Sequence, residues 1–181
     1  MKGVIVTKDP VVLKGYQSIL KLSEYRKYNL AAILPDDIIA NLEEGRKELI
    51  AEQKSKLKNP RRCTIKPEPW METGKGQTQA KFAWKEGKEP PILDTDCNPI
   101  TDTELPLDVG SKVKLAFTQS GYTLGDGETI GTRLSLLGIQ VIELDLSGID
   151  VGDLAPSQIA ALFGKTDGYK FPKVSSDEPK S

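Results

Sequence analysis

Aromatic rings interleaved with basic side chains are the residues of this chain whose types and spacing could do chemistry. Residues 54–88 carry ten Lys and Arg against three Glu, a net charge of +7 (10 − 3), and they include both tryptophans, Trp70 and Trp84. A nucleic-acid phosphate is attracted by the charges close to it and not by the net charge of the chain, because charges are screened beyond about 8 Å at physiological salt. Unpaired bases stack on exposed rings, which is worth about 1–3 kcal/mol per base. The pattern indicates a surface for single-stranded nucleic acid, although the whole chain has a net charge of −1.

A second stretch of this kind covers residues 109–144, which read as two long strands joined by a Gly-rich turn. Alternation in the first strand puts Val113, Leu115 and Phe117 on one face and two lysines on the other. Tyr122 ends a QSGY segment that reads as a turn. The candidate ssDNA-binding residues of both stretches are Arg61, Arg62, Lys66, Trp70, Lys75, Lys81, Trp84, Lys85, Lys112, Lys114, Tyr122 and Arg133.

Several of the rings admit a purely structural interpretation. Trp70 is either a stacking ring or an anchor that packs its loop on the domain, and Tyr122 either stacks or packs on its turn. One-sided alternation over residues 79–85 favours Phe82, and to a lesser degree Trp84, as core side chains. Tyr28 and the two tyrosines before it are interpreted as parts of a solvated turn rather than of a site.

The side chains that catalysis would need are missing from the sequence. It has no histidine, which removes an imidazole base and any Ser-His dyad. Acidic pairs at positions 94 and 96 and at 126 and 128 lie among turn residues, where turn chemistry explains them. Cys63 and Cys97 are interpreted as reduced cytoplasmic thiols. We therefore expect no enzymatic activity, no cofactor and no metal site.

Hydrophobic periodicity predicts one long helix inserted among strands. The helix begins at Pro35, where two aspartates favour the positive end of the helix dipole, and ends before Asn59-Pro60. Residues 60–76 read as an irregular loop, and Gly138 marks a bulge or bend in the last strand. The expected strands are 2–6, 28–34, 79–85, 92–94, 112–118 and 132–144, with 9–22 ambiguous and a short helix at 156–163.

This order predicts a mostly β fold, a five-stranded OB-fold barrel with one long inserted helix and a short C-terminal helix. A ubiquitin-like or ferredoxin-like fold is the alternative, but it would need a second long amphipathic helix. We divide the chain into a nucleic-acid-binding domain (1–146), a C-terminal extension (147–172) and a polar, disordered tail (173–181). No apolar run approaches the roughly 20 residues that span a bilayer, so we expect no membrane association.

The order and spacing of five segments resemble the podophage single-stranded DNA-binding protein family over residues 28–144. The segments are YNLAAILPDDIIANLEEGRKELIAEQ, QAKFAWKEG, ILDTDCNPI, ELPLDVGSKVKLAFTQSGY and TRLSLLGIQVIEL. The resemblance implies an OB-fold protein without enzymatic activity that protects ssDNA in phage DNA replication, recombination and repair, in the host cytoplasm. It also implies a homodimer, and recruitment of the phage polymerase and helicase through an acidic tail. The last residues of this chain, FPKVSSDEPKS, depart from that acidic pattern.

Apolar side chains after the last expected strand offer a candidate dimer surface. Ile159, Leu162 and Phe163 share one face of the short helix, which needs a partner because an isolated helix of that length is marginal in water. The partner is its own barrel or a second subunit, and we expect self-association through residues 145–172. Two other function classes stay open: an RNA-binding OB-fold protein, and an interaction module whose basic patch meets an acidic protein.

Overall fold

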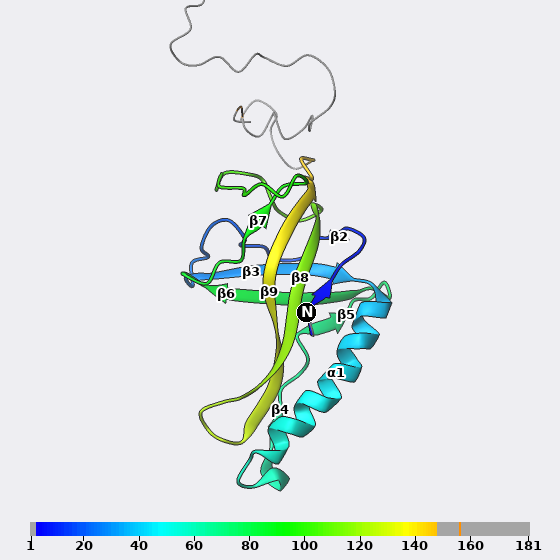
Figure 1. Ribbon diagram of the computed structural model, residues 1–181, viewed down its shortest axis with the longest axis vertical. Helices are drawn as coiled ribbons and strands as arrows, with labels where there is room; N and C mark the ends of the chain where they lie inside the picture. The colour runs from blue at the N-terminus through cyan, green and yellow to red at the C-terminus, as the bar shows by residue number, and fades with distance from the viewer. Residues whose placement is uncertain (1–2, 148–155, 157–181) are drawn as a thin grey trace, which may run out of the picture.

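The computed structural model of the protein describes residues 3–147 and 156. In this part of the chain a single long helix is inserted among strands, as the sequence predicts (Figure 1). The helix α1 spans Asp36–Ser55, and a 3-10 turn, η1, spans Pro60–Arg62. The strands are β1 (Ile5–Val6), β2 (Val11–Val12), β3 (Lys27–Leu34), β4 (Thr64–Ile65), β5 (Trp70–Glu72), β6 (Thr78–Lys85), β7 (Ile92–Leu93), β8 (Lys112–Thr123) and β9 (Thr129–Glu143).

The strands form two sheets. One has the order β1-β8-β9-β4, with β2 also paired to β8 and β7 to β9, and the other has the order β3-β6-β5. An isolated bridge between Leu13 and Ala32 connects them. β6 lies against β9, but no ladder joins these two strands in residues 3–147, where β4 and β7 occupy the edge of β9 away from β8. The mostly β fold with one long helix is confirmed, whereas the expected closed five-stranded barrel differs from these two sheets.

Apolar side chains that alternate along the strands fill the space between the sheets. Phe82 of β6 and Phe117 of β8 are buried and meet edge to face, with ring centroids 5.1 Å apart. Val113 and Leu115 are buried on the same face of β8 as Phe117, which confirms the alternation read from the sequence. The interpretation of Phe82 as a core residue is also confirmed.

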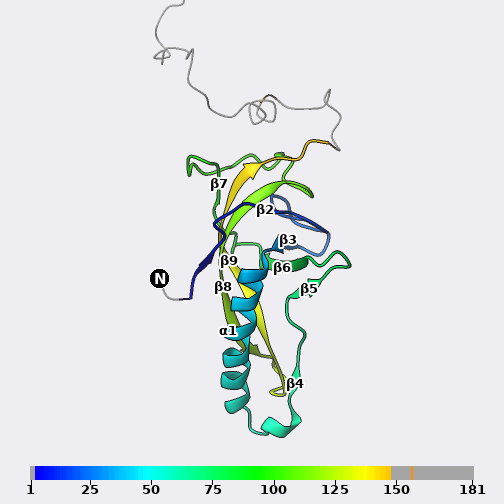
Figure 2. The ribbon, with the colours of Figure 1, turned by 90° about the vertical axis from the view of Figure 1, so that its right-hand side faces the viewer.

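The β8–β9 hairpin continues beyond the sheets as an arm, residues 118–135, with α1 alongside it (Figures 1 and 2). On the face toward α1, the Gln119 side-chain amide donates to the backbone carbonyl of Leu42 at 3.0 Å. Gly121 lies on the same face, where an added Cβ would come 2.8 Å from Cγ of Gln53. Backbone and side chains of α1 therefore cover one face of the arm. The opposite face of the arm is not covered by α1.

The ends of α1 agree with the sequence prediction. Pro35 is extended (ψ 155°), Asp36 and Asp37 follow in the first turn, and the helix stops at Ser55, before Asn59-Pro60. The predicted irregularity at Gly138 is confirmed as a register shift between Ala116 and Phe117, which leaves Leu137 of β9 without a partner.

Short elements were predicted less well. Residues 60–76, expected as an irregular loop, contain η1, β4 and β5, because pairing with β9 and β6 stabilises strands too short to show a period. The expected strand at 2–6 is reduced to β1, and 9–22 contains only β2. The predicted helix at 156–163 lies outside the described residues except Pro156, as do the extension after Ser147 and the tail. Within the described part, no helix is long and apolar enough to cross a membrane.

Candidate nucleic-acid interface

Three elements bring Lys66, Tyr122 and Gly131 together on the face of the arm that α1 does not cover. Lys66 follows β4, and its backbone N–H donates to the carbonyl of Ile130 at 2.8 Å, which places it beside Gly131 of β9. Tyr122 of β8 is directly opposite Gly131. An added Cβ on Gly131 would lie 2.6 Å from the Tyr122 hydroxyl and 3.1 Å from Cβ of Lys66. The absent side chain of Gly131 therefore makes room for the tyrosine ring beside the lysine.

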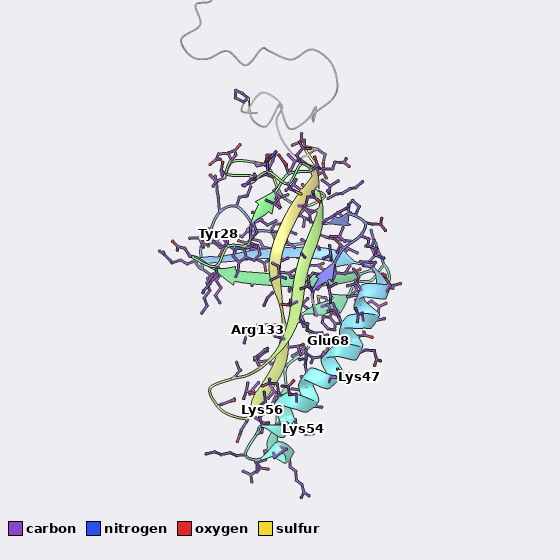
Figure 3. The ribbon with its side chains drawn as sticks, in the orientation of Figure 1. Tyr28, Lys47, Lys54, Lys56, Glu68 and Arg133 are labelled. Carbon is purple, nitrogen blue, oxygen red and sulfur yellow. The ribbon has the colours of Figure 1, made fainter. Side chains whose placement is uncertain are left out.

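Arg133 completes this group, which we call the arm cluster (Lys66, Tyr122, Arg133). Its guanidinium carbon lies 5.0 Å from the centroid of the Tyr122 ring, a cation–π contact. The side chain is exposed and lies on the side of the arm away from Lys47 and Lys54 of α1 (Figure 3). A guanidinium beside a ring offers a planar cation on which a base can stack and N–H groups for a phosphate.

The position of Tyr122 corrects one expectation. The residue is in strand β8 and half-buried, and the QSGY segment that it ends is part of that strand and not a turn. The turn of the hairpin lies further on, at residues 124–128, because β8 stays paired with β9 as far as Thr123. Tyr122 and Arg133 belong to one site through this pairing and not through closeness in sequence.

On β6, Lys81 and Lys85 are exposed and alternate with buried Ala80 and Phe82, as predicted. Trp84 is half-buried and stacks on Tyr28 of β3, with centroids 5.6 Å apart and planes within 6°. Its indole N–H has no hydrogen-bond partner among the described residues. Tyr28, first interpreted as part of a solvated turn, is thus a structural partner of Trp84. It lies at the end of β3 away from α1 (Figure 3).

The pKa of the Tyr28 hydroxyl is raised above its ordinary value of 10.0. Burial of the hydroxyl is the main cause, and the negative charges of Glu89 and Glu86 add to it. The ring is therefore neutral at physiological pH and suited to packing against Trp84.

Trp70 is the clearest correction among the predicted site residues. It is buried, at 6% exposure, and begins strand β5 opposite Ala80 of β6. The ring is part of the hydrophobic core and not an exposed platform, because the β5–β6 pairing turns it inward. The other basic candidates of this region are exposed: Lys75 in the turn between β5 and β6, and Arg61 and Arg62 in η1.

Lys112 and Lys114 are not part of the arm cluster. They lie at the opposite end of β8, ten and eight residues from Tyr122, or about 33 and about 26 Å of strand. Lys112 is exposed and forms an ion pair with Glu143 at 3.5 Å, and Lys114 is half-buried. The structure therefore divides the predicted residues among the arm, the β6 face and the far end of β8.

Arg46 is a residue that sequence reasoning missed. From α1 it donates to the Thr132 hydroxyl at 2.5 Å and to the Lys66 carbonyl at 2.7 Å, and it lies 3.9 Å from a carboxylate oxygen of Glu68. Only 13% of its side chain is exposed. It positions Lys66 relative to the arm. No local pattern distinguishes it from the other charged residues of the helix.

Acidic turn residues have the roles that the sequence indicated. Asp94 accepts backbone hydrogen bonds from Asp96 and Asn98 at 2.8 and 2.9 Å. Asp126 accepts backbone hydrogen bonds from Glu128 and Thr129, both at 2.9 Å. Among residues 3–147 and 156, no group of three or more His, Cys, Asp or Glu side chains is arranged to hold a metal ion.

No protein-family model matches this sequence, and no curated protein sequence does. Solved structures do match. For gp2.5, a single-stranded DNA-binding protein encoded by bacteriophage T7, the TM-score is 0.62 at 16% identity, covering 83% of this chain and 97% of that one. A C-terminal truncation of the single-stranded DNA-binding protein from bacteriophage Enc34 gives 0.55 at 15% identity, covering 79% and 87%. The Enc34 protein in complex with ssDNA gives 0.52 at 14%, covering 79% and 88%. Over most of its length, this chain shares its fold with phage single-stranded DNA-binding proteins.

Proposed function

We propose that this protein binds single-stranded DNA without sequence preference and catalyses no reaction. In this proposal the two sheets form an OB-type domain, with the arm as part of the binding surface. Non-specific binding follows from the kind of contact: every base has a face that can stack, and phosphates are the same along any sequence.

The arm cluster is the observation that carries the proposal. A guanidinium 5.0 Å from a tyrosine ring stands beside an exposed lysine, on the face of the arm that α1 does not cover. Cations beside a planar group suit a strand whose bases are unpaired, because a duplex keeps its bases stacked and inaccessible. The likeness of fold to phage ssDNA-binding proteins supports the same ligand.

The test is fluorescence anisotropy of labelled oligonucleotides longer than the about 16 nucleotides that one OB fold covers. Oligo-dT should bind tightly, and a duplex of equal length should bind weakly. Equal affinity for the duplex and for oligo-dT would contradict the proposal. Parallel titrations with oligo-U and with an acidic protein, each at two salt concentrations, distinguish ssDNA binding from RNA binding and from protein interaction.

We infer a role in phage DNA replication, recombination and repair from the same likeness, with phage polymerase and helicase as candidate partners. Bound protein keeps the bases of the ssDNA unpaired for these enzymes and protects the DNA strand from nucleases. Nuclease protection of a phage replication intermediate, with and without the protein, tests the role. Pull-down of purified polymerase and helicase tests the partners, and failure of both to bind would remove them.

We also propose self-association through residues 145–172. The apolar positions Ile159, Leu162 and Phe163 need a surface to pack on, and a second subunit supplies one. Light scattering of the full chain at micromolar concentration should give the mass of a dimer. A chain truncated after Ser147 should be a monomer that still binds oligo-dT. A monomeric full chain would contradict the proposal.

A further inference from the structure

The end of the β3–β6 ladder brings two like charges together. Lys27 of β3 is directly opposite Lys85 of β6. Directly opposed side chains of an antiparallel pair have Cβ atoms about 4.5–5.5 Å apart, and like charges at such positions destabilise the pair. Both lysines are exposed. The sheet therefore maintains a repulsive pair at a surface position where almost any neutral residue fits.

Nearby carboxylates do not neutralise this pair. Glu86 is next to Lys85 in sequence, but it forms an ion pair with Arg26 at 3.0 Å. Glu89 accepts a hydrogen bond from the backbone N–H of Gly87 at 3.0 Å. Within the described ranges, no ion pair joins Lys27 or Lys85 to an acidic side chain. The positive charge at this position is left for a ligand.

Packing on the other face of the sheet keeps the two lysines from separating. The next pair along the ladder is Tyr28 and Trp84, whose rings stack with centroids 5.6 Å apart. Aromatic pairs across strands stabilise the ladder and so act against the repulsion between the lysines. The ring pair thus fixes both strand ends, and with them the Lys27–Lys85 pair.

A third lysine extends the positive charge along the same face. Lys81 is opposite Ala31 and four residues, about 13 Å, before Lys85 on β6. The position between them on β6 is Ala83, which is exposed and small. The side chains thus leave an unobstructed strip between cations, which suits an extended polyanion better than a single small anion.

We propose that Lys27 and Lys85 form a phosphate-binding site for the backbone of a single-stranded nucleic acid, with Lys81 as its continuation. The inference rests on the proposed function and adds a contact separate from the arm cluster. The bound phosphate offsets the repulsion between the two lysines. Tyr25, 83% exposed and two residues before Lys27, supplies a ring for a neighbouring base.

The first test uses two measurements that should change in opposite directions. Lys27→Gln should raise the melting temperature by about 1–4 °C, because it removes the repulsion. The same variant should weaken oligo-dT binding and lower the slope of log affinity against log salt by about 0.7. In a Lys85→Gln background, Lys27→Gln should give no further gain in melting temperature, because the pair is already broken.

Matched controls separate this site from general loss of charge. Lys81→Gln should lower the salt slope without raising the melting temperature, because Lys81 opposes Ala31 and not a cation. Lys21→Gln removes one exposed cation that is already paired with Glu104 at 2.7 Å, and it should leave oligo-dT binding unchanged. A fall in melting temperature with Lys27→Gln would overturn the repulsion on which the site rests.

A second ligand distinguishes nucleic acid from other polyanions. Tripolyphosphate should raise the melting temperature of the parent chain but not of the Lys27→Gln variant. Tyr25→Leu should weaken binding of oligo-dT and leave binding of tripolyphosphate unchanged. If the parent chain binds oligo-dT and the Lys27→Gln/Lys85→Gln variant binds it equally well, this inference fails and the proposed function stands. If the parent chain does not bind oligo-dT, both fail.

Discussion

Arg46 and Thr132 lie 86 residues apart in the sequence and are joined by a hydrogen bond of 2.5 Å from Nη1 to Oγ1. A second bond, from Nη2 to the carbonyl of Lys66 at 2.7 Å, adds the segment after β4. One side chain therefore ties α1 to β9 and to a member of the arm cluster. Thr132 is buried, at 3% exposure, so its hydroxyl has no easy access to water if the arginine is removed.

Arg46→Met should destabilise the protein by about 1–3 kcal/mol, because it leaves the buried hydroxyl of Thr132 without its donor. Methionine keeps the aliphatic part of the side chain, so the loss reports the polar contacts. Chemical denaturation followed by circular dichroism measures it. Lys54→Met, at an exposed position of the same helix, should stay within about 0.5 kcal/mol of the parent chain. Equal stability of the two variants would contradict the role of Arg46.

The arm cluster should account for part of the salt dependence of ssDNA binding. Lys66→Gln and Arg133→Gln should each lower the slope of log affinity against log salt by about 0.7, the value for one phosphate contact of a single strand. Lys112→Gln is the matched control, since Lys112 lies at the other end of β8 and pairs with Glu143 at 3.5 Å. A salt slope that falls with Lys112→Gln and not with Arg133→Gln would move the site to that end.

The parts of the fold that the sequence predicted correctly are those encoded by local patterns. α1 begins directly after Pro35 because proline and two aspartates suit a helix start, and that signal needs no distant residue. Alternation over β8 and β6 likewise indicated that Phe117 and Phe82 are buried. Both patterns repeat over several residues of one segment, so they can be read without knowing the fold.

The candidate site was predicted only in part, because its members meet through pairing between distant strands. Trp70 was expected in an irregular loop, as a stacking ring or as an anchor of that loop, since its surroundings are rich in Pro and Gly. It instead begins strand β5 opposite Ala80 and is buried. Lys27 and Lys85 are 58 residues apart (85 − 27), and their opposition appears only in the register of β3 and β6. A sequence gives the types of such residues and not which of them face each other.

Asp126 should make the turn of the arm sensitive to acid. Its pKa is lowered from the ordinary value of 3.8, first by the hydrogen bond from the Thr129 hydroxyl and then by backbone N–H donors of Glu128 and Thr129. Because the pKa is lower in the folded state, the carboxylate stabilises the turn above 3.8, and the effect is lost as pH falls through the folded pKa. Hydrogen exchange at the turn amides, measured above pH 3.8 and below the folded pKa of Asp126, should show that the turn opens faster at the lower pH.

Asp126→Asn should remove this acid-sensitive part of the protection of the turn, because an amide does not ionise in this range. Thr129→Val should reduce it, because the hydroxyl that donates at 2.6 Å is lost while the backbone donors remain. The same pH dependence of exchange in Asp126→Asn and in the parent chain would assign the effect to another group.

Gly131 should be needed for the geometry of the arm cluster and not for the fold. An alanine Cβ would come 2.6 Å from Oη and 2.7 Å from Cζ of Tyr122, so the ring must move away from its place beside Arg133. Arg133, no longer held by the ring, then has to be ordered when DNA binds, which costs about 0.5–1.5 kcal/mol per side chain, so Gly131→Ala should weaken oligo-dT binding about two- to twelvefold. Gly125→Ala is the control, because nothing lies within 4 Å of a Cβ there.

In a Tyr122→Ala background, Gly131→Ala should have no further effect on affinity, since the ring that it displaces is gone. A further loss in that background would mean that the added methyl group acts through the backbone of β9 and not through the tyrosine.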